Sequence, residues 1–189
     1  MKIWLTSDTH FGHNQSFLYE PRGFKNIEEM NIEIIKRWNS VVNSEDRVIH
    51  LGDVMLNDNN TGIECLKQLN GEICLIYGNH CTDARKELIH INIPQIITLG
   101  YAHQFKYKKF SIYCSHYPTL TSNYDEKHFS QHVISLHGHT HSKEKWIFPD
   151  NPFLYNVALD AHNCYPVALD DIIVDIRNKW NEIKNLTSK

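Results

Sequence analysis

The sequence predicts an α/β fold in which short strands alternate with amphipathic helices and assemble into mixed β-sheets. Short apolar runs end in small or polar residues, as strands do where they enter loops. Between these runs, apolar residues recur at spacings of three and four, which is typical of helices that bury one face. The second half also contains an expected antiparallel hairpin. Alternating elements followed by a hairpin indicate sheets with both parallel and antiparallel pairs.

The expected strands are short, and most of them precede a residue that could bind a ligand. They cover residues 3–6, 47–51, 73–77, 95–99, 111–114 and 134–136. Residues 101–107 and 110–114, joined through Lys108 and Lys109, form the expected hairpin.

The expected helices follow from apolar side chains at helical spacing. One face is formed by Ile27, Met30, Ile34, Trp38 and Val41, and another by Ile172, Ile173, Ile176, Trp180 and Ile183. A shorter stretch with Ile63, Leu66 and Leu69 precedes Gly71, a residue type that often ends helices. The first half of the chain is therefore expected to run β-α-β-α-β.

Length and composition predict one folded domain spanning residues 1–189. Hydrophobic residues make up 41% and charged residues 22%, which excludes a disordered chain. No apolar run approaches the roughly 20 residues of a membrane-spanning helix, so no membrane partner is expected. The formal net charge of -3 argues against a large cationic surface for nucleic acid.

Cysteine and histidine usage point to location and to chemistry. The five cysteines are scattered and lack CxxC spacing, which indicates reduced thiols in a cytoplasmic protein. Asp8 follows the first apolar run too closely for a signal-peptide core. Histidine accounts for 13 of the 189 residues, an excess that is the first indication of function.

Side chains that bind metal ions follow several of the expected strands. They are Asp8 and His10, Asp53, Asn79 with His80, His116, and His139 with His141. Ligands bind outside the carboxyl ends of strands in open α/β sheets, so these distant residues can converge. Carboxylates, an amide oxygen and imidazoles suit Mn²⁺, Fe²⁺ or Zn²⁺, and so many ligands exceed one tetrahedral site. We therefore expect two adjacent divalent ions that share a carboxylate.

These motifs occur in an order that resembles the calcineurin-like metallophosphoesterases. The order is Asp8-x-His10, Gly52-Asp53, Gly78-Asn79-His80, His116 and Gly138-His139-x-His141, within residues 1–141. Each motif is weak alone, whereas the ordered set is specific. The sequence at residues 6–13, at Asn156-Val157 and at residues 165–167 resembles the small stand-alone branch of this family that is found in bacteria and phages. The resemblance implies a four-layer α-β-β-α sandwich with two mixed β-sheets and a dinuclear metal site at the strand ends.

The resemblance also implies a role for each position. Asp8, His10 and His141 would bind one ion, Asn79, His116 and His139 the other, and Asp53 would bridge them. A hydroxide shared by the two ions would attack phosphorus. His80 would be the catalytic histidine, which stabilises the phosphate and protonates the leaving oxygen.

Residues beside the motifs have structural and functional interpretations. Cys81 stands where the family usually has Asp or Glu, which affects the tuning of His80, although a packing cysteine is favoured. His13, Asn14 and Arg22 are candidates for contact with the substrate phosphate, against ordinary loop or surface roles.

Other histidines are expected away from the ions. His50 and His137 lie inside apolar runs and are expected to be hydrogen-bonded in the core. Asp160 and His162 could orient ligands from behind. Residues 117–132, which include Tyr124 and His132, could form one wall of the substrate pocket, although a plain loop is favoured.

The expected function is hydrolysis of phosphate esters, with phosphodiesters of the nucleotide type as substrates. Phosphoprotein phosphatases of this superfamily carry an arginine soon after Gly-Asp, and residues 52–58 contain none. The alternatives are a phosphomonoesterase of small metabolites and a non-catalytic, metal-containing binding module. The expected partner is a small phosphate-ester substrate, such as a nucleotide, and the sequence leaves the oligomeric state open.

Overall fold

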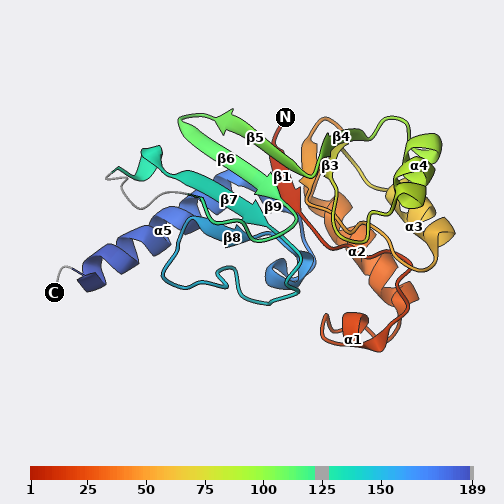
Figure 1. Ribbon diagram of the computed structural model, residues 1–189. Helices are drawn as coiled ribbons and strands as arrows, with labels where there is room; N and C mark the ends of the chain where they lie inside the picture. Colours follow the sequence, from red (N-terminus) through yellow and green to blue (C-terminus); the bar gives the residue numbers. More distant parts are fainter. Residues whose placement is uncertain (122–127, 188–189) are drawn as a thin grey trace.

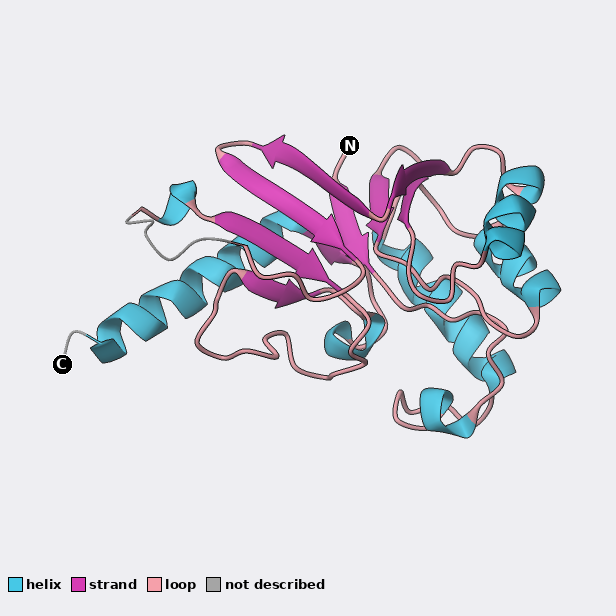
Figure 2. Ribbon diagram, in the orientation of Figure 1, coloured by secondary structure: helices cyan, strands magenta, loops and turns pink. Residues whose placement is uncertain are grey.

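The structure is a computed structural model that describes residues 1–121 and 128–187. The chain folds into two β-sheets with flanking helices (Figures 1 and 2). The strands are β1 (Ile3–Thr6), β2 (Arg47–His50), β3 (Glu72–Ile76), β4 (Ile97–Gly100), β5 (Ala102–Tyr107), β6 (Phe110–Ser115), β7 (Val133–His137), β8 (Leu154–Asn156) and β9 (Val167–Ala168). The helices are α1 (Ser16–Tyr19), α2 (Ile27–Val41), α3 (Asn59–Leu66), α4 (Asp83–Asn92) and α5 (Leu169–Thr187), with the 3₁₀ turns η1 (Phe129–Gln131) and η2 (Leu159–His162).

The first sheet has the strand order β4-β3-β2-β1-β9. Strands β1 to β4 pair in parallel, whereas β9 runs antiparallel to β1. One face of this sheet packs against α2, α3 and α4, where Trp4, Val48 and Leu75 join Trp38 and Ile89 in one buried cluster. Because β1, β2 and β3 are parallel and adjacent, their carboxyl ends lie together at one edge.

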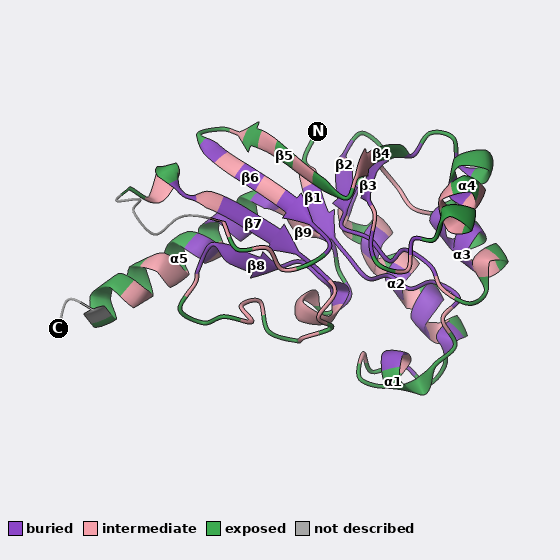
Figure 3. Ribbon diagram, in the orientation of Figure 1, coloured by how far each residue is buried: buried purple, intermediate pink, exposed green. Residues whose placement is uncertain are grey.

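The second sheet has the strand order β5-β6-β7-β8, with an antiparallel β5-β6 hairpin and parallel pairs beyond it. Its inner face buries Ile112 and Leu136 against Leu5 and Ile49 of the first sheet. Helix α5 runs along this sheet and adds Ile172 to the same cluster (Figure 1). A second buried core therefore lies where the two sheets and α5 meet, in addition to the one beneath α2 (Figure 3).

Helix α2 shows how the sequence positions these layers. The side chain of Asn26 caps its first turn by accepting the Glu29 N–H at 2.8 Å. Ile34 and Trp38 lie on its buried face, and the Trp38 indole donates to the Asn70 carbonyl at 3.0 Å. Burial of each large apolar side chain contributes roughly 1.5–3 kcal/mol, so this face fixes the helix against the sheet.

The expected α/β class with two mixed sheets is confirmed, and so is the hairpin at β5-β6. The strand expected at residues 95–99 is β4, which begins two residues later, at Ile97. The sequence pattern does not predict helices α1 and α4 or strands β8 and β9. Ile89 is the buried residue of α4, so its apolar period is weak, and β9 is only two residues long. None of the described helices is long and apolar enough to cross a membrane.

Candidate metal centre

The residues expected to bind metal lie just beyond the carboxyl ends of strands from both sheets. Asp8 and His10 follow β1, Asp53 follows β2, Asn79 follows β3, His116 follows β6, and His139 and His141 follow β7. The two sheets meet at these ends. The backbone N–H of His139 donates to Asp8 Oδ2 at 2.9 Å, and His116 Nδ1 lies 2.8 Å from the Leu51 carbonyl oxygen. Parallel pairing therefore brings together residues that are far apart in sequence.

Most of these residues adopt a left-handed backbone conformation. The φ angles are 61° at Asp8, 48° at His10, 55° at Asp53, 68° at His139 and 49° at His141. Such angles cost of the order of 1–3 kcal/mol each in non-glycine residues, and they concentrate at functional sites. Cross-strand hydrogen bonds hold them, because Asp8 N–H donates to Gly52 O and His10 N–H donates to Asp53 O, both at 3.0 Å. The strain turns the side chains of successive strand ends toward a common space.

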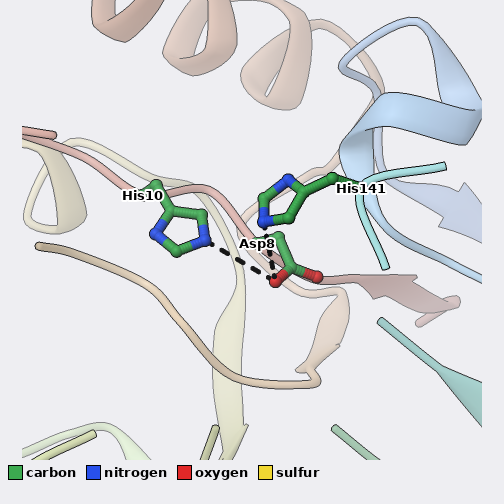
Figure 4. A group of neighbouring side chains, drawn as sticks. All are labelled: Asp8, His10 and His141. Carbon is green, nitrogen blue, oxygen red and sulfur yellow. Dashed lines mark ion pairs between the residues drawn. The ribbon is translucent and has the colours of Figure 1, made fainter. Parts of the chain in front are cut away.

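Asp8, His10 and His141 form the first group of candidate ligands (Figure 4). Asp8 Oδ1 lies 3.7 Å from His10 Nε2 and 3.8 Å from His141 Nε2. Asp8 Oδ1 and both ring nitrogens of His10 are buried without a hydrogen-bond partner. Buried polar atoms left unpaired are costly. A cation between these atoms would remove that cost, so the group fits a metal ion.

Asp53 and His116, together with Asp8, form a second group of candidate ligands, and Asn79 and His139 lie beside it. His116 Nε2 lies 2.7 Å from Asn79 Oδ1 and 3.2 Å from Asp53 Oδ2, and His139 Nδ1 lies 3.0 Å from the same amide oxygen. The carbonyl of Leu51 accepts the proton of His116 Nδ1, which leaves Nε2 of the neutral ring as an acceptor. Acceptor atoms would then face one another, an arrangement that a cation between them stabilises.

Asp53 lies between the two groups. Its Oδ2 is 3.2 Å from His116 Nε2 and 4.0 Å from His10 Nε2, and these histidines belong to different groups. Its Oδ1 accepts the backbone N–H of His80 at 2.9 Å. This position suits a carboxylate shared by two ions.

The absence of a side chain at Gly138 permits the closest approach in the site. A Cβ atom at this position would overlap Ser7 Oγ and Asp8 Oδ2. Gly78 is similar, because a Cβ there would overlap Asp53 Oδ1. The glycines in the Gly-Asn-His and Gly-His-x-His motifs therefore leave room for the carboxylates of the neighbouring strands.

The charges of the site favour a bound cation. Burial alone would raise the pKa of Asp8, but the imidazoles of His10, His116 and His141 outweigh it and hold that pKa below its ordinary value. Burial would lower the pKa of His116, yet the carboxylates of Asp53 and Asp8 raise it. Burial also lowers the pKa of His10, which keeps that imidazole neutral and able to act as a ligand. The ionised, buried carboxylates of Asp8 and Asp53 therefore favour positive charge beside them, which a bound cation would supply.

A buried ion pair orients His141 from behind. Asp160 Oδ2 lies 3.2 Å from His141 Nδ1, and Arg22 donates to Asp160 through Nε at 2.9 Å and Nη2 at 2.8 Å. The Arg22 and Asp160 side chains are only 1% and 7% exposed. A carboxylate on one ring nitrogen fixes the tautomer, so the other nitrogen of His141 is free to bind an ion.

The contacts of Arg22 differ from the phosphate contact that the sequence suggested. Besides Asp160, Nη2 of Arg22 donates to the backbone oxygen of Asp8 at 2.7 Å. Its donors are therefore turned toward acceptors inside the protein, and the geometry makes Arg22 a positioning residue. The sequence suggests that Asp160 could orient a ligand from behind, but it does not indicate that Arg22 pairs with Asp160.

His80 and His13 lie beside the candidate ligands. The His80 ring is 5.7 Å from the ring of His10, and the His13 ring is 5.5 Å from the same ring. Burial and the neighbouring histidines lower the pKa of His13 to about 4. Both rings line a cavity next to the site. Asn14, the other residue expected at the phosphate, is exposed and does not line that cavity.

Cys81 packs under the turn that carries Asn79 and His80. Its side chain is buried, and Sγ accepts the backbone N–H of Gly78 at 3.3 Å. Burial raises the pKa of this thiol above its ordinary value. These contacts support the packing interpretation of Cys81 rather than a charged one.

His50 and His137 lie in the core behind the site. His50 Nδ1 accepts the Gly52 N–H at 3.2 Å, and its Nε2 lies 3.1 Å from Thr9 Oγ1. Burial lowers the pKa of His50 to about 3, so this ring is a neutral brace for the turn before Asp53. His137 Nδ1 lies 2.9 Å from the Gly138 oxygen, whereas its Nε2 is buried without a partner.

The structure separates the residues expected in a wall at 117–132. Tyr117 is half-exposed and contacts the rings of His116 and His139 edge-on, at centroid distances of 5.3 and 4.6 Å. His132 instead stacks on Phe153 at 4.0 Å, within the aromatic cluster against α5. Tyr124 lies outside the described residues. Of the described residues in this segment, those at its start therefore lie beside the metal centre.

Two mixed sheets with carboxylates and imidazoles gathered at their meeting edge form a site that could hold divalent metal ions. Residues 1–147 match the calcineurin-like phosphoesterase superfamily domain. The chain therefore belongs to the calcineurin-like phosphoesterase superfamily and is a phosphoester hydrolase.

Relatives and a solved structure extend this similarity over most of the chain. An uncharacterized protein of Methanocaldococcus jannaschii is 34% identical over 194 residues, which cover 98% of this chain and 96% of that protein. The Gene 66 protein of Mycobacterium phage D29 is 28% identical over 206 residues, covering 96% and 97%. This phage relative agrees with the small stand-alone branch that the sequence resembles. A protein of unknown function from Aquifex aeolicus shares the fold, with a TM-score of 0.65, 24% identity and coverage of 90% and 97%.

Proposed function

We propose that the protein hydrolyses phosphodiesters of the nucleotide type, with two divalent metal ions at the site. The observation that carries the preference for diesters is the charge of the cavity beside the candidate ligands. Its described wall consists of His10, His13, Phe17, Leu18, Pro21, Leu56, His80, His141 and Asp160. No lysine or arginine belongs to this described wall. The second negative charge of a monoester would therefore gain no fixed cation from the protein.

The residues after Gly52-Asp53 support the same preference. Val54 and Met55 are buried in the core, and Leu56 lines the cavity where a phosphate-binding arginine could otherwise reach. Arg22 is near in space, but its donors are engaged by Asp160 and the Asp8 carbonyl. A singly charged diester suits such a cavity better than a doubly charged monoester.

The ligand groups suggest how two ions would be held. Asp8, His10 and His141 would bind one ion, and Asn79, His116 and His139 the other, with Asp53 shared. Mn²⁺, Fe²⁺ and Zn²⁺ suit this mixture of oxygen and imidazole donors. When bound, the ions supply a water of lowered pKa and positive charge opposite the phosphate oxygens. The chain contributes fixed ligand positions, since His139 N–H binds Asp8 and Leu51 O holds the His116 tautomer.

His80 is proposed as the residue that protonates the leaving oxygen from a ring nitrogen. Its backbone is fixed at both ends, because its N–H donates to Asp53 Oδ1 at 2.9 Å and its carbonyl accepts Arg85 Nη1 at 2.8 Å. Its ring lines the cavity beside His10. A histidine beside the ligands, and not between them, suits proton transfer to a substrate.

A substrate panel tests the proposal. Chelator-treated protein is given Mn²⁺, Fe²⁺ or Zn²⁺ and assayed on bis(nitrophenyl) phosphate and nucleoside cyclic phosphates, with nitrophenyl phosphate and nucleoside monophosphates as the monoesters. We expect higher kcat/KM for diesters than for monoesters. A consistent preference for monoesters would establish the phosphomonoesterase alternative. No turnover of any ester with any ion would favour the binding module.

A further inference from the structure

We propose that the α1 segment carries a platform for the planar base of the substrate, with Phe17 as the side chain on which the base stacks. This inference rests on the proposed function, because it concerns the organic group of the same substrate. The cavity beside the metal centre has a volume of about 560 Å³, within the roughly 300–1,000 Å³ typical of small-molecule sites. His10 and His141 form its metal-side wall, and Phe17 and Leu56 belong to its apolar part.

Phe17 offers an exposed aromatic ring on a segment that its neighbour Leu18 anchors in the core. The Phe17 residue is 70% exposed although it lines the cavity, whereas the next residue, Leu18, is 5% exposed and packs into the core. The Phe17 ring meets His13 at a centroid distance of 5.7 Å and an interplanar angle of 82°. Leu18 therefore anchors the segment while Phe17 remains open to a ligand. Such a ring stacks well on any base, because every base has a π-face.

Consecutive ring contacts lead from the metal side of the cavity to Phe17. The His10 ring lies 5.5 Å from the His13 ring, which in turn contacts Phe17. Phe17 is thus two ring contacts away from a candidate metal ligand, a separation that a sugar between phosphate and base can span. The α1 segment lies apart from both sheets, beside one end of α2 (Figure 1).

The described wall of the cavity favours an uncharged group of the substrate beside Phe17. A second phosphate would require a lysine or arginine, and the described wall has neither. The carboxylate in the wall belongs to Asp160, which is already paired with Arg22. An uncharged planar base is therefore the occupant that the apolar, aromatic side of the cavity favours.

Equilibrium binding of two matched ligands to the Mn²⁺-loaded protein tests the platform. Adenosine monophosphate and ribose 5-phosphate carry the same phosphate and sugar and differ in the base. We expect calorimetry to show at least about fivefold tighter binding of adenosine monophosphate, the lower end of what base stacking on an aromatic contributes. Phe17→Ala should abolish most of this ratio, and Phe17→Tyr should retain it. Phe148→Ala removes another exposed phenylalanine, outside this cavity, and should leave the ratio unchanged.

Each outcome bears on the platform separately from the reaction. Equal affinity for the two ligands, or an unchanged ratio in Phe17→Ala, would overturn the platform even if diesters are hydrolysed. A base-dependent ratio that Phe17→Ala removes would support it even if the substrate panel showed no preference for diesters. The base platform, tested by the ratio of affinities, and the diester preference, tested by the substrate panel, can therefore be refuted separately.

Discussion

Arg22 and Asp160 are 138 positions apart in sequence, and their side chains form a two-point ion pair buried behind His141. The guanidinium binds both carboxylate oxygens and the Asp8 carbonyl, so one side chain links the loop before α2 to η2 and to the end of β1. Two-point pairing between guanidinium and carboxylate fixes geometry better than a point charge does. The pair therefore positions the His141 ring, although neither residue belongs to the candidate ligand groups.

The variant Asp160→Asn should weaken metal binding at the Asp8, His10 and His141 group. It keeps the size of the side chain but removes the charge that holds Arg22 and favours the His141 tautomer. Loss of such an outer partner typically lowers metal affinity by roughly 10–100-fold. Competition with a chelating dye measures the affinity, and Asp150→Asn, an exposed change, serves as the control. Equal affinity in Asp160→Asn and wild type would contradict the positioning role.

Asp53→Asn should weaken both proposed ions together, because its carboxylate lies between His10 and His116. Metal analysis after chelation and reconstitution should show two ions per wild-type chain and fewer in the variant. A wild-type protein that reaches full activity with one ion would rule out the dinuclear site.

His80→Ala should lower turnover while leaving metal content near that of wild type, because His80 lies beside the ligand groups and not within them. Proton donation is typically worth roughly 10²–10⁴-fold. The loss should be greater for a nucleotide diester, whose alkoxide needs a proton, than for a nitrophenyl diester. His90→Ala on α4 changes an exposed histidine and provides the control. Similar losses on both substrates would indicate charge stabilisation, and loss of metal would make His80 a ligand.

Gly138→Ala should disrupt the metal centre, because the added methyl group would overlap Ser7 Oγ and Asp8 Oδ2. Overpacking of this kind costs about 1–3 kcal/mol, and here it displaces a candidate ligand. Gly100→Ala adds a methyl group where no atom lies within 4 Å; its φ of 80° makes the substitution locally strained, but the variant should keep its metal. Thermal unfolding and metal analysis of the two variants distinguish local strain from damage to the site. Normal metal content in Gly138→Ala would show that the close approach is dispensable.

Asp46 should make a pH-dependent contribution to the free energy of unfolding. The pKa of Asp46 is held below its ordinary value because its carboxylate accepts the Lys2 N–H at 2.6 Å, the Trp4 indole N–H at 3.1 Å and the Asn43 N–H at 3.2 Å. Its stabilising effect is fully present above the unfolded pKa of about 3.9 and is lost as the pH falls through the lower folded pKa. Asp46→Asn should therefore be less stable than wild type at pH 7.

Urea unfolding at a series of pH values measures this difference. The gap between Asp46→Asn and wild type should narrow as the pH falls below about 4. Glu45→Gln changes the exposed neighbouring carboxylate and should show no comparable trend. If the difference in free energy of unfolding stays constant with pH, the loss of charge at Asp46 does not contribute, and the variant is destabilised only by altered packing and hydrogen bonds.

Much of the fold could be predicted because local pattern and tertiary packing agree there. In α2, residues at helical spacing form the buried face, and β1 and β2 are short apolar runs that pair in parallel. The apolar pattern does not predict α4, where few residues are buried, or β9, which forms a strand by pairing with β1. Those elements depend on contacts that no local period records.

The sequence by itself determined the α/β class, the strand-end positions of the candidate ligands and the family motifs, because alternation, helical spacing and motif order are local or sequential properties. The tertiary structure decided which side chains face one another. It turned Arg22 from a candidate phosphate contact into the partner of Asp160, packed Cys81 beneath its turn, and placed Phe17 at the cavity wall. The physical reason is that these relationships depend on the meeting of two sheets and a distant loop, which sequence separation does not encode.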